Sequence, residues 1–569
     1  MSCNMLVFNH KEFFWKRTIL MLLIAFLLIP AGQAQRRVSG TNIHYEEGDW
    51  ISYSNTRYVN SLAIGTQYVY FATTGGITRY DIFQSRWNFP FTTSNGLPSN
   101  NILTVAFDVG TSHLWCATTE AVCYYNPGSR RWRTLYYDEL GMSGGPVTSI
   151  GFSEHQIWLV TAEGQTFVAS KSDMEFIKET LRTSEDNKDS IIWFGEKGFV
   201  PLTLPQFFLP DGIIFFPGPD RTYLQDFKLR QFDFSYYAVD PWQTLWFGTR
   251  GWGAGNANMR TQNMRLLPFG LIGQDVHALA SDGSGLWIGG VQHSDPIKGI
   301  TYWDQKHNTW KYFEARYLTR MRSDDVTSIA PDGRYVWFGT LDGLVCYIRS
   351  KNQWYSYTVF DGLSDNYIYD VIVDSQSVWI ATEDGLDRID KHSIDKGSPI
   401  IEHITNPADK VTVFDIELDR QQLWAGTNYG IYFYDTVKRI GGYYRGPNGP
   451  GARIVTAVSA NNDQVWFGTL TGVEVYDRVH RVWKGPPERR FATNLPVITI
   501  KATDKAVWVG TEQAVYKYDK QRRTWRLFTT EDGLLDNTVQ AILPAGDYVW
   551  FGTPKGLTRF YWNAPYRID

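Results

Sequence analysis

The chain has 569 residues, of which 43% are hydrophobic, 16% aromatic and 20% charged, and its formal net charge is −4. This length exceeds that of one average domain, and the abundance of aromatic residues excludes a disordered or low-complexity protein. The weakly negative charge argues against nucleic-acid binding, which requires a basic face.

The chain begins with the features of an export signal. Lys11, Lys16 and Arg17 form a basic region, residues 18–30 are almost wholly apolar, and residues 32–34 (Gly-Gln-Ala) are suited to cleavage. We therefore expect residues 1–34 to be a signal peptide and the mature protein to be periplasmic, extracellular or on the cell surface. An uncleaved membrane anchor is the alternative, and no second apolar run of spanning length follows.

One short pattern recurs along most of the chain: an apolar residue, Trp, an apolar residue, Gly or Ala, and usually Thr. Clear copies occupy residues 114–118, 245–249 and 336–340, and looser copies centre on Tyr70, Trp158 and Trp287. Trp193 lies in a degenerate stretch that could mark a further copy. The pattern also recurs at intervals of 45, 42, 42 and 42 residues between Trp379, Trp424, Trp466, Trp508 and Trp550.

The remainder of each unit is equally regular. A turn leads to Gly-Leu, Gly-Ile or Gly-Val, a second strand often ends in Tyr-Asp, and another Trp comes seven residues after that Tyr, as in Tyr476 and Trp483. A continuously apolar strand is typical of a sheet covered on both faces, and about 42 residues accommodate one four-stranded propeller blade. The pattern excludes a helical solenoid because no period near 3.6 persists.

The two ends of the repeat region are complementary. Residues 49–53 (Asp-Trp-Ile-Ser-Tyr) precede the first unit and are similar to the outer strand at residues 524–528. The last unit has Arg567 where an outer-strand Trp is expected. We therefore predict that the N-terminal strand completes the last blade, which also covers two sheet edges.

The number of units predicts an all-β fold of two β-propellers with four-stranded blades, about 12–14 blades in total, because one ring of that size would have a poorly filled centre. Since the two ends share a ring, the other ring must be inserted between them. The regular repeat pattern is interrupted at residues 165–240 and 391–410. We therefore predict one propeller from residues 35–165 and 401–569, with the second inserted at residues 166–400. Two sequential halves are the alternative.

Two cysteines are placed symmetrically about a predicted hairpin turn. Cys116 and Cys123 flank Thr119 and Glu120 and could therefore face each other across two strands. Export permits a disulfide, and two buried free thiols are the preferred alternative. Cys346 is left unpaired in either case.

No motif of catalysis or metal binding stands out. Residues 141–145 (Gly-Met-Ser-Gly-Gly) fit the nucleophile-elbow pattern but lie in a turn between blades, whereas that motif requires a strand-turn-helix context. Histidines are scattered, and the acidic turn at residues 281–285 lacks the ligands of a calcium loop. The sequence therefore predicts no cofactor, no metal and no enzymatic activity.

Two consecutive hairpins, at residues 250–258 and 291–296, are longer than the others. On one face of a propeller they would combine an aromatic platform with amide, imidazole and carboxylate groups, which suits a sugar or a polar peptide. Ordinary loop variation or contact between the rings is the alternative. The candidate ligand-binding residues are Arg250, Trp252, Asn256, Asn258, Gln292, His293 and Asp295.

The units resemble the two-component regulator propeller repeat. The matching stretches are residues 361–366 (Asp-Gly-Leu-Ser-Asp-Asn) followed by 379–386 (Trp-Ile-Ala-Thr-Glu-Asp-Gly-Leu), and the same turn recurs at residues 95–100 and 532–537. The resemblance covers nearly all of residues 45–562. It implies paired propellers, often the periplasmic sensor of a membrane histidine kinase that responds to glycans, and a similar plan occurs in an accessory protein of the type IX secretion system.

The chain departs from both relatives, since it shows neither a transmembrane helix with a kinase nor a C-terminal sandwich domain after the repeats. We therefore expect an exported, non-catalytic propeller protein that binds a glycan, a polar peptide or a protein partner, without nucleic acid and without a membrane span. The alternatives are a propeller-based carbohydrate-active lyase or hydrolase, a secretion-system scaffold, and a sensor that works with a separate kinase.

Overall fold

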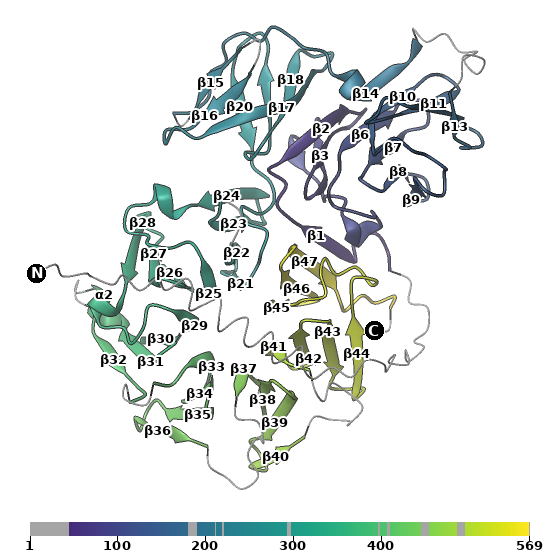
Figure 1. Ribbon diagram of the computed structural model, residues 1–569. Coiled ribbons are helices and arrows are strands. Elements are labelled where there is room, and N and C mark those ends of the chain that lie inside the picture. The colour runs from purple at the N-terminus through teal and green to yellow at the C-terminus, as the bar shows by residue number, and fades with distance from the viewer. Residues whose placement is uncertain are drawn as a thin grey trace, which may run out of the picture. The chain divides into compact units, whose positions relative to one another are not determined.

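A computed structural model of the protein describes residues 45–179, 190–210, 212–218, 221–292, 297–395, 399–406, 410–444, 454–461, 463–485 and 495–567 (Figure 1). These residues form eleven antiparallel sheets, and their one α-helix, α2 (Lys391–Asp395), has five residues. The fold is all-β, as the repeat predicts. None of the described helices is long and apolar enough to cross a membrane. The predicted signal peptide, residues 1–34, lies outside the described residues.

Seven sheets form a closed ring, which we call the seven-blade ring. The innermost strands contact one another in chain order, and the last of them, β45, contacts the first, β21. From inner to outer strand, the sheets are β21 (Ala278–Ser281), β22 (Gly285–Gly289), β23 (Ile300–Asp304), β24 (Thr309–Phe313); β25 (Val326–Asp332), β26 (Tyr335–Thr340), β27 (Gly343–Ile348), β28 (Gln353–Tyr357); β29 (Ile368–Val373), β30 (Ser377–Thr382), β31 (Gly385–Asp390), β32 (Ile401–His403); β33 (Val413–Asp419), β34 (Gln422–Thr427), β35 (Gly430–Asp435), β36 (Ile440–Tyr443); β37 (Val455–Asn461), β38 (Gln464–Thr469), β39 (Gly472–Asp477), β40 (Val482–Lys484); β41 (Val497–Ala502), β42 (Ala506–Thr511), β43 (Val515–Asp519), β44 (Thr524–Phe528); and β45 (Ala541–Ala545), β46 (Tyr548–Thr553), β47 (Gly556–Tyr561), β1 (Trp50–Tyr53).

The N-terminal strand closes this ring. β1 pairs antiparallel with β47, with Trp50 opposite Phe560, which is the pairing predicted from the two ends of the repeat region. Where the last sheet meets the start of the first, the Val276 backbone N–H donates to the Thr553 carbonyl oxygen at 3.0 Å. Strand β1 therefore completes the last sheet (Figure 1), and the hydrogen bond between Val276 and Thr553 joins the last sheet to the segment that leads into the first.

The other four sheets make a second group, which we call the four-blade ring. Strand β2 contacts β6 and β17, and β6 contacts β10. The sheets are β2 (Val59–Ile64), β3 (Tyr68–Thr73), β4 (Gly76–Asp81), β5 (Arg86–Trp87); β6 (Thr104–Asp108), β7 (His113–Ala117), β8 (Ala121–Asn126), β9 (Arg131–Tyr136); β14 (Ile192–Gly195), β10 (Val147–Phe152), β11 (Gln156–Thr161), β12 (Thr166–Ser170), β13 (Ile177–Lys178); and β15 (Ile214–Phe216), β16 (Tyr223–Gln225), β17 (Gln231–Val239), β18 (Thr244–Thr249), β19 (Ala254–Asn258), β20 (Met264–Leu267).

Strand β14 links these four sheets. It pairs with β10 and contacts both β2 and β6, and the Tyr236 hydroxyl of β17 donates to the Gly195 carbonyl oxygen at 3.1 Å. Trp193, considered from the sequence as a further repeat copy, lies on β14, and strands β15 and β16 extend the sheet of β17. The described residues thus hold eleven sheets rather than 12–14, because this stretch adds strands to existing blades.

The sheets divide between the two rings differently from the predicted division into residues 35–165 with 401–569 and residues 166–400. Val59 of β2 packs directly against Gly248 of β18, so the sheets around Tyr70 and Trp115 belong with that of Trp246. The four-blade ring is therefore the inserted one, between β1 and β21. The irregular stretch at residues 391–410 contains α2 and β32, which complete one blade.

The repeat residues explain how each blade forms. Trp337 of β26 is fully buried and packs with Val371 and Ile380 of the next sheet, so the indole wedges neighbouring sheets together. The Thr340 hydroxyl donates to the Gly343 carbonyl oxygen at 2.6 Å and closes the following hairpin. Gly343 has a φ of 101°, which favours glycine. Each repeated residue type therefore has a specific packing or turn role.

Candidate functional site

The predicted loop residue Trp252 lies in the hairpin between β18 and β19. Its indole is half-buried and stacks on Phe232, with ring centroids 4.5 Å apart and planes inclined by 29°. Its backbone N–H donates to the Thr249 hydroxyl at 3.0 Å. Arg250 is exposed in the same hairpin, and its backbone N–H donates to the Asp233 carbonyl oxygen. One face of this aromatic side chain is thus packed on Phe232.

The predicted amides have local structural partners. Asn256 is buried on β19, and its Oδ1 accepts from Arg265 Nε at 2.9 Å. Asn258 Oδ1 accepts the backbone N–H groups of the following turn at 3.0 and 2.9 Å. Gln292 Nε2 donates to the Asp275 carbonyl oxygen at 2.8 Å. His293 and Asp295 lie outside the described residues.

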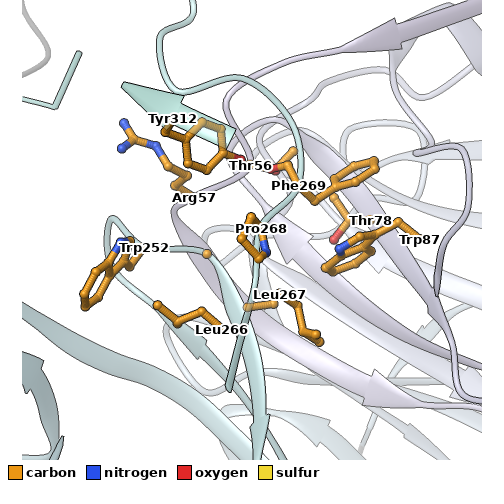
Figure 2. Close-up of a pocket in the computed structure, with 12 residues that line it drawn as sticks. Thr56, Arg57, Thr78, Trp87, Trp252, Leu266, Leu267, Pro268, Phe269 and Tyr312 are labelled. Carbon is orange, nitrogen blue, oxygen red and sulfur yellow. The ribbon is translucent and has the colours of Figure 1, made fainter. Parts of the chain in front are cut away.

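A small cavity adjoins Trp252 (Figure 2). Its volume is about 50 Å³, enough for a few waters but far below the roughly 300–1,000 Å³ of ligand pockets. Its polar groups have partners within the protein: Thr56 Oγ1 donates to the Phe269 carbonyl oxygen at 2.9 Å, and the Tyr312 hydroxyl donates to the Gly270 carbonyl oxygen at 3.1 Å. Neither Gln292 nor Asn258 lines it. The small cavity is therefore part of the packing between the rings.

A second hollow, which we call the aromatic cavity, has a volume of about 590 Å³, within the range of ligand pockets. Its walls come from both rings: β5 and the residues after it, the turn between β23 and β24, and strands β1, β46 and β47. The lining residues are Tyr53, Arg86, Trp87, Asn88, Phe89, Phe269, Trp303, Gln305, Lys306, Asn308, Ala545, Tyr548, Trp550 and Arg559.

The aromatic wall of this cavity is held by mutual ring contacts. Tyr53 and Trp303 have ring centroids 4.8 Å apart, and Trp303 and Trp550 meet edge-on at 5.7 Å. On the side of the four-blade ring, Trp87 and Phe269 are 4.8 Å apart. These five side chains belong to one buried cluster. The wall is therefore preorganised, which reduces the entropy that a ligand must overcome on binding.

Amide groups connect the wall to the surface. Asn308 Nδ2 donates to the Trp87 carbonyl oxygen at 3.0 Å, and its Oδ1 accepts from Trp303 Nε1 at 3.3 Å. Asn308 thus fixes two aromatic residues from different rings. Gln305 and Lys306 are exposed at the turn that follows β23, where their side chains can reach a ligand at the cavity mouth.

Arg559 of β47 brings positive charge into the cavity. Its guanidinium lies over the rings of Tyr548, Phe89 and Trp550, at 4.6, 5.4 and 5.9 Å from the centroids. Burial raises the pKa of the Tyr53 hydroxyl, and the charge of Arg559 opposes this rise. Arg86 and Lys306 add two more cations, and none of the lining residues is acidic. The cavity thus combines aromatic side chains, amides and positive charge, with no acidic residue in its described lining.

Sequence reasoning missed this site for a physical reason. Trp87 and Trp550 occupy repeat positions that hold Trp in other units, and Trp303 stands where other units have Tyr, as at Tyr80. Arg559 occupies a position where Arg79 and Arg388 stand in other units. Nothing in one unit marks these residues as special. Only the apposition of two rings brings them to one hollow.

A Ser-His-Asp cluster bears on the enzymatic alternative. His403 Nδ1 lies 2.9 Å from Ser364 Oγ and 2.8 Å from Asp387 Oδ1, and Ser364 Oγ donates to Asp387 Oδ1 at 2.6 Å. A catalytic relay requires the two imidazole nitrogens to contact serine and aspartate separately. Here one nitrogen contacts both, so this cluster lacks relay geometry. The described residues also contain no group of three or more His, Cys, Asp or Glu that could hold a metal.

The fold and the cavity define the class of this protein as a double β-propeller with an aromatic hollow walled by both rings. No protein-family model and no curated protein matches the chain.

Several solved structures are similar to it. PorZ, an essential bacterial surface component of the type-IX secretion system of Porphyromonas gingivalis, matches over 89% of this chain and 74% of its own, with 14% identity and a TM-score of 0.45. The extracellular domain of a putative one component system from B. thetaiotaomicron matches over 90% and 71%, with 16% identity and a TM-score of 0.46. That of a putative hybrid two component system from the same organism matches over 93% and 76%, with 15% identity and a TM-score of 0.40. A secretion-system component and a two-component sensor are also the two kinds of protein that the repeat resembles. At these identities and TM-scores, the similarity says nothing about the ligand of this chain.

Proposed function

We propose that this protein is an exported binding protein without catalytic activity, and that the aromatic cavity is its ligand site. The observation that carries the proposal is a hollow of about 590 Å³ whose wall is a set of mutually packed aromatic rings with amides and cations at its edge. Pockets that combine apolar faces with a few oriented polar groups are typical ligand sites.

A saccharide is the ligand class that this lining favours. The half-buried phenol of Tyr548 supplies an apolar surface for the C–H face of a sugar ring, with the buried indoles of Trp303 and Trp550 behind it. The exposed Gln305 supplies a donor and an acceptor for hydroxyl groups. The small cavity beside Trp252 cannot accept a sugar ring because of its volume. We therefore place binding at the aromatic cavity and not at the enlarged hairpins.

The test is a binding titration with a panel of neutral and acidic oligosaccharides, combined with analysis of the products after long incubation. We expect saturable binding and unchanged oligosaccharides. New reducing ends or unsaturated products would instead support the enzymatic alternative.

Three substitutions locate the site. Tyr548→Ala removes a half-buried cavity ring and should weaken binding by about tenfold or more, since one such contact contributes on the order of 1 kcal/mol or more. Trp252→Ala tests the enlarged hairpin, and Phe360→Ala removes a ring that is 90% exposed and outside the cavity. We expect the last two to bind as the wild type does. If Trp252→Ala loses binding and Tyr548→Ala retains it, the ligand binds at the enlarged hairpins and not in the aromatic cavity.

A further inference from the structure

Three arginines occupy the same position in their repeat units. On the strand that follows the central one, Arg79 lies opposite Tyr70, Arg388 opposite Trp379, and Arg559 opposite Trp550. Each guanidinium lies near aromatic rings. The three side chains therefore share backbone register and surroundings, and they can be compared directly by their hydrogen-bond and ion-pair partners.

Among the described residues, Arg79 and Arg388 have hydrogen-bond partners and Arg559 has none. Arg79 Nε donates to the Phe89 carbonyl oxygen at 2.7 Å. Arg388 Nε donates to Ser377 Oγ at 2.7 Å, and its Nη1 forms an ion pair with Glu402 at 3.0 Å. Arg559 forms no hydrogen bond or ion pair within the described part of the chain, and its Nε is buried without a partner.

The Nε–H group of Arg559 is buried without a partner among the described residues, which is unfavourable. The residue as a whole is half-buried, so its terminal nitrogens remain accessible from the cavity. No lining residue of the aromatic cavity is acidic, and Arg86 and Lys306 add to the positive charge. Within the described residues, no acidic side chain thus lines the cavity beside Arg559.

We infer that the ligand of the aromatic cavity is a saccharide that carries a carboxylate, a hexuronic acid residue, and that Arg559 binds this carboxylate. The inference rests on the proposed function of the cavity. A planar guanidinium matches the two oxygens of a carboxylate in a bidentate geometry, and the neighbouring half-buried ring of Tyr548 can contact the apolar face of the same sugar.

The experiment compares acidic oligosaccharides with their own methyl esters, which keep the sugar rings and remove the charge. The probes are oligomers of galacturonate and of glucuronate, each as the free acid and as the ester. They are titrated against the full-length wild type, Arg559→Gln and Arg388→Gln. Arg388→Gln removes an arginine from the equivalent repeat position outside the cavity.

For the wild type and Arg388→Gln we expect the acid of at least one series to bind about tenfold or more tightly than its ester, a difference typical of a charge-assisted bidentate contact. For Arg559→Gln we expect equal affinities for acid and ester, close to that of the wild type for the ester. Added salt should weaken acid binding to the wild type and not ester binding.

Two failures are distinguishable. Equal binding of acid and ester by the wild type, or a preference that survives in Arg559→Gln, overturns the inference and leaves the proposed function standing. Absence of binding by every saccharide overturns the proposed function and the inference with it. If Arg559→Gln does not fold, Arg559→Lys retains the charge without the planar fork and should keep only part of the preference for the acid; an undiminished preference would overturn the assignment.

Discussion

The indole of Trp50 lies flat on the ring of Phe560, with ring centroids 3.9 Å apart and planes inclined by 10°. Trp50 belongs to the first strand of the described chain and Phe560 to the last. Both side chains are buried, at 2% and 0% exposure. This stack joins the two ends of the seven-blade ring and makes its stability depend on residues far apart in sequence.

Trp50→Ala should therefore destabilise the protein strongly. Removal of a fully buried Trp leaves a cavity and costs about 3–5 kcal/mol, and here it also weakens the pairing of β1 with β47. Urea denaturation followed by circular dichroism measures the loss. The control Phe360→Ala removes a ring that is 90% exposed and should leave the midpoint unchanged. A loss in Trp50→Ala no larger than in this control would show that β1 does not hold the ring closed.

Gly552→Ala should weaken the contact between the last sheet of the seven-blade ring and the segment around Val276 that leads into the first sheet. A Cβ at Gly552 would lie 2.7 Å from the Val276 carbonyl oxygen and 2.8 Å from its Cγ1, so the first and last sheets must move apart. Overpacking of this kind costs about 1–3 kcal/mol. Gly442→Ala is the matched control, since nothing lies within 4 Å of its added Cβ. Equal melting temperatures for the two variants would contradict the close approach of the sheets at Val276.

Asp415→Asn should make the protein more stable at neutral pH. Burial and the neighbouring Asp370 carboxylate raise the pKa of Asp415 well above its usual value, and Lys501 acts in the opposite direction. The folded protein therefore binds this proton more tightly than the unfolded chain. The stabilisation is complete below the unfolded pKa and is lost as the pH rises through the folded pKa.

The asparagine variant mimics the protonated state, so its advantage over the wild type should grow as the pH rises. Melting temperatures between about pH 4 and about pH 8 measure this difference. Glu139→Gln makes the same charge change at an exposed side chain and should show no such trend. A constant difference between Asp415→Asn and the wild type at every pH would mean that Asp415 does not titrate in this range.

The three described cysteines should react with thiol reagents only after unfolding. Cys116 and Cys123 are cross-strand partners on β7 and β8, and both are free and fully buried, as is Cys346. Burial raises the pKa of Cys116 and of Cys346, which lowers the fraction of reactive thiolate. Maleimide labelling of the denatured, unreduced protein should modify all three. Labelling of Cys346 alone would show that the cross-strand pair forms a disulfide in the exported protein.

The repeat made much of the fold predictable. Trp337, Thr340 and Gly343 act within one blade or between neighbours, through a wedge, a hydroxyl bond and a positive φ, and these roles depend on local spacing. The pairing of residues 50–53 with the last blade was predictable for the same reason, since an unmatched outer strand needs a partner.

The ring membership and the proposed binding site were not predictable in this way. Val59 packs on Gly248, whereas the contact of Val276 with Gly552 closes the other ring, although both pairs show the same residue types. Because every unit presents the same edge, the sequence contains no signal for which unit packs on which. The sequence also contains no signal that Phe232 covers one face of the Trp252 indole.

The sequence by itself thus determined the blade, its wedge residues and the joining of the chain ends, because these depend on side chains a few positions apart or on one unmatched strand. Only the tertiary structure decided that four sheets and seven sheets form separate rings. It also decided that Arg559, which has no hydrogen-bond partner among the described residues, lies in a hollow walled by both rings. The physical reason is that identical repeat edges can pack in many orders of similar local energy, and a cavity between rings exists only after one of those orders is chosen.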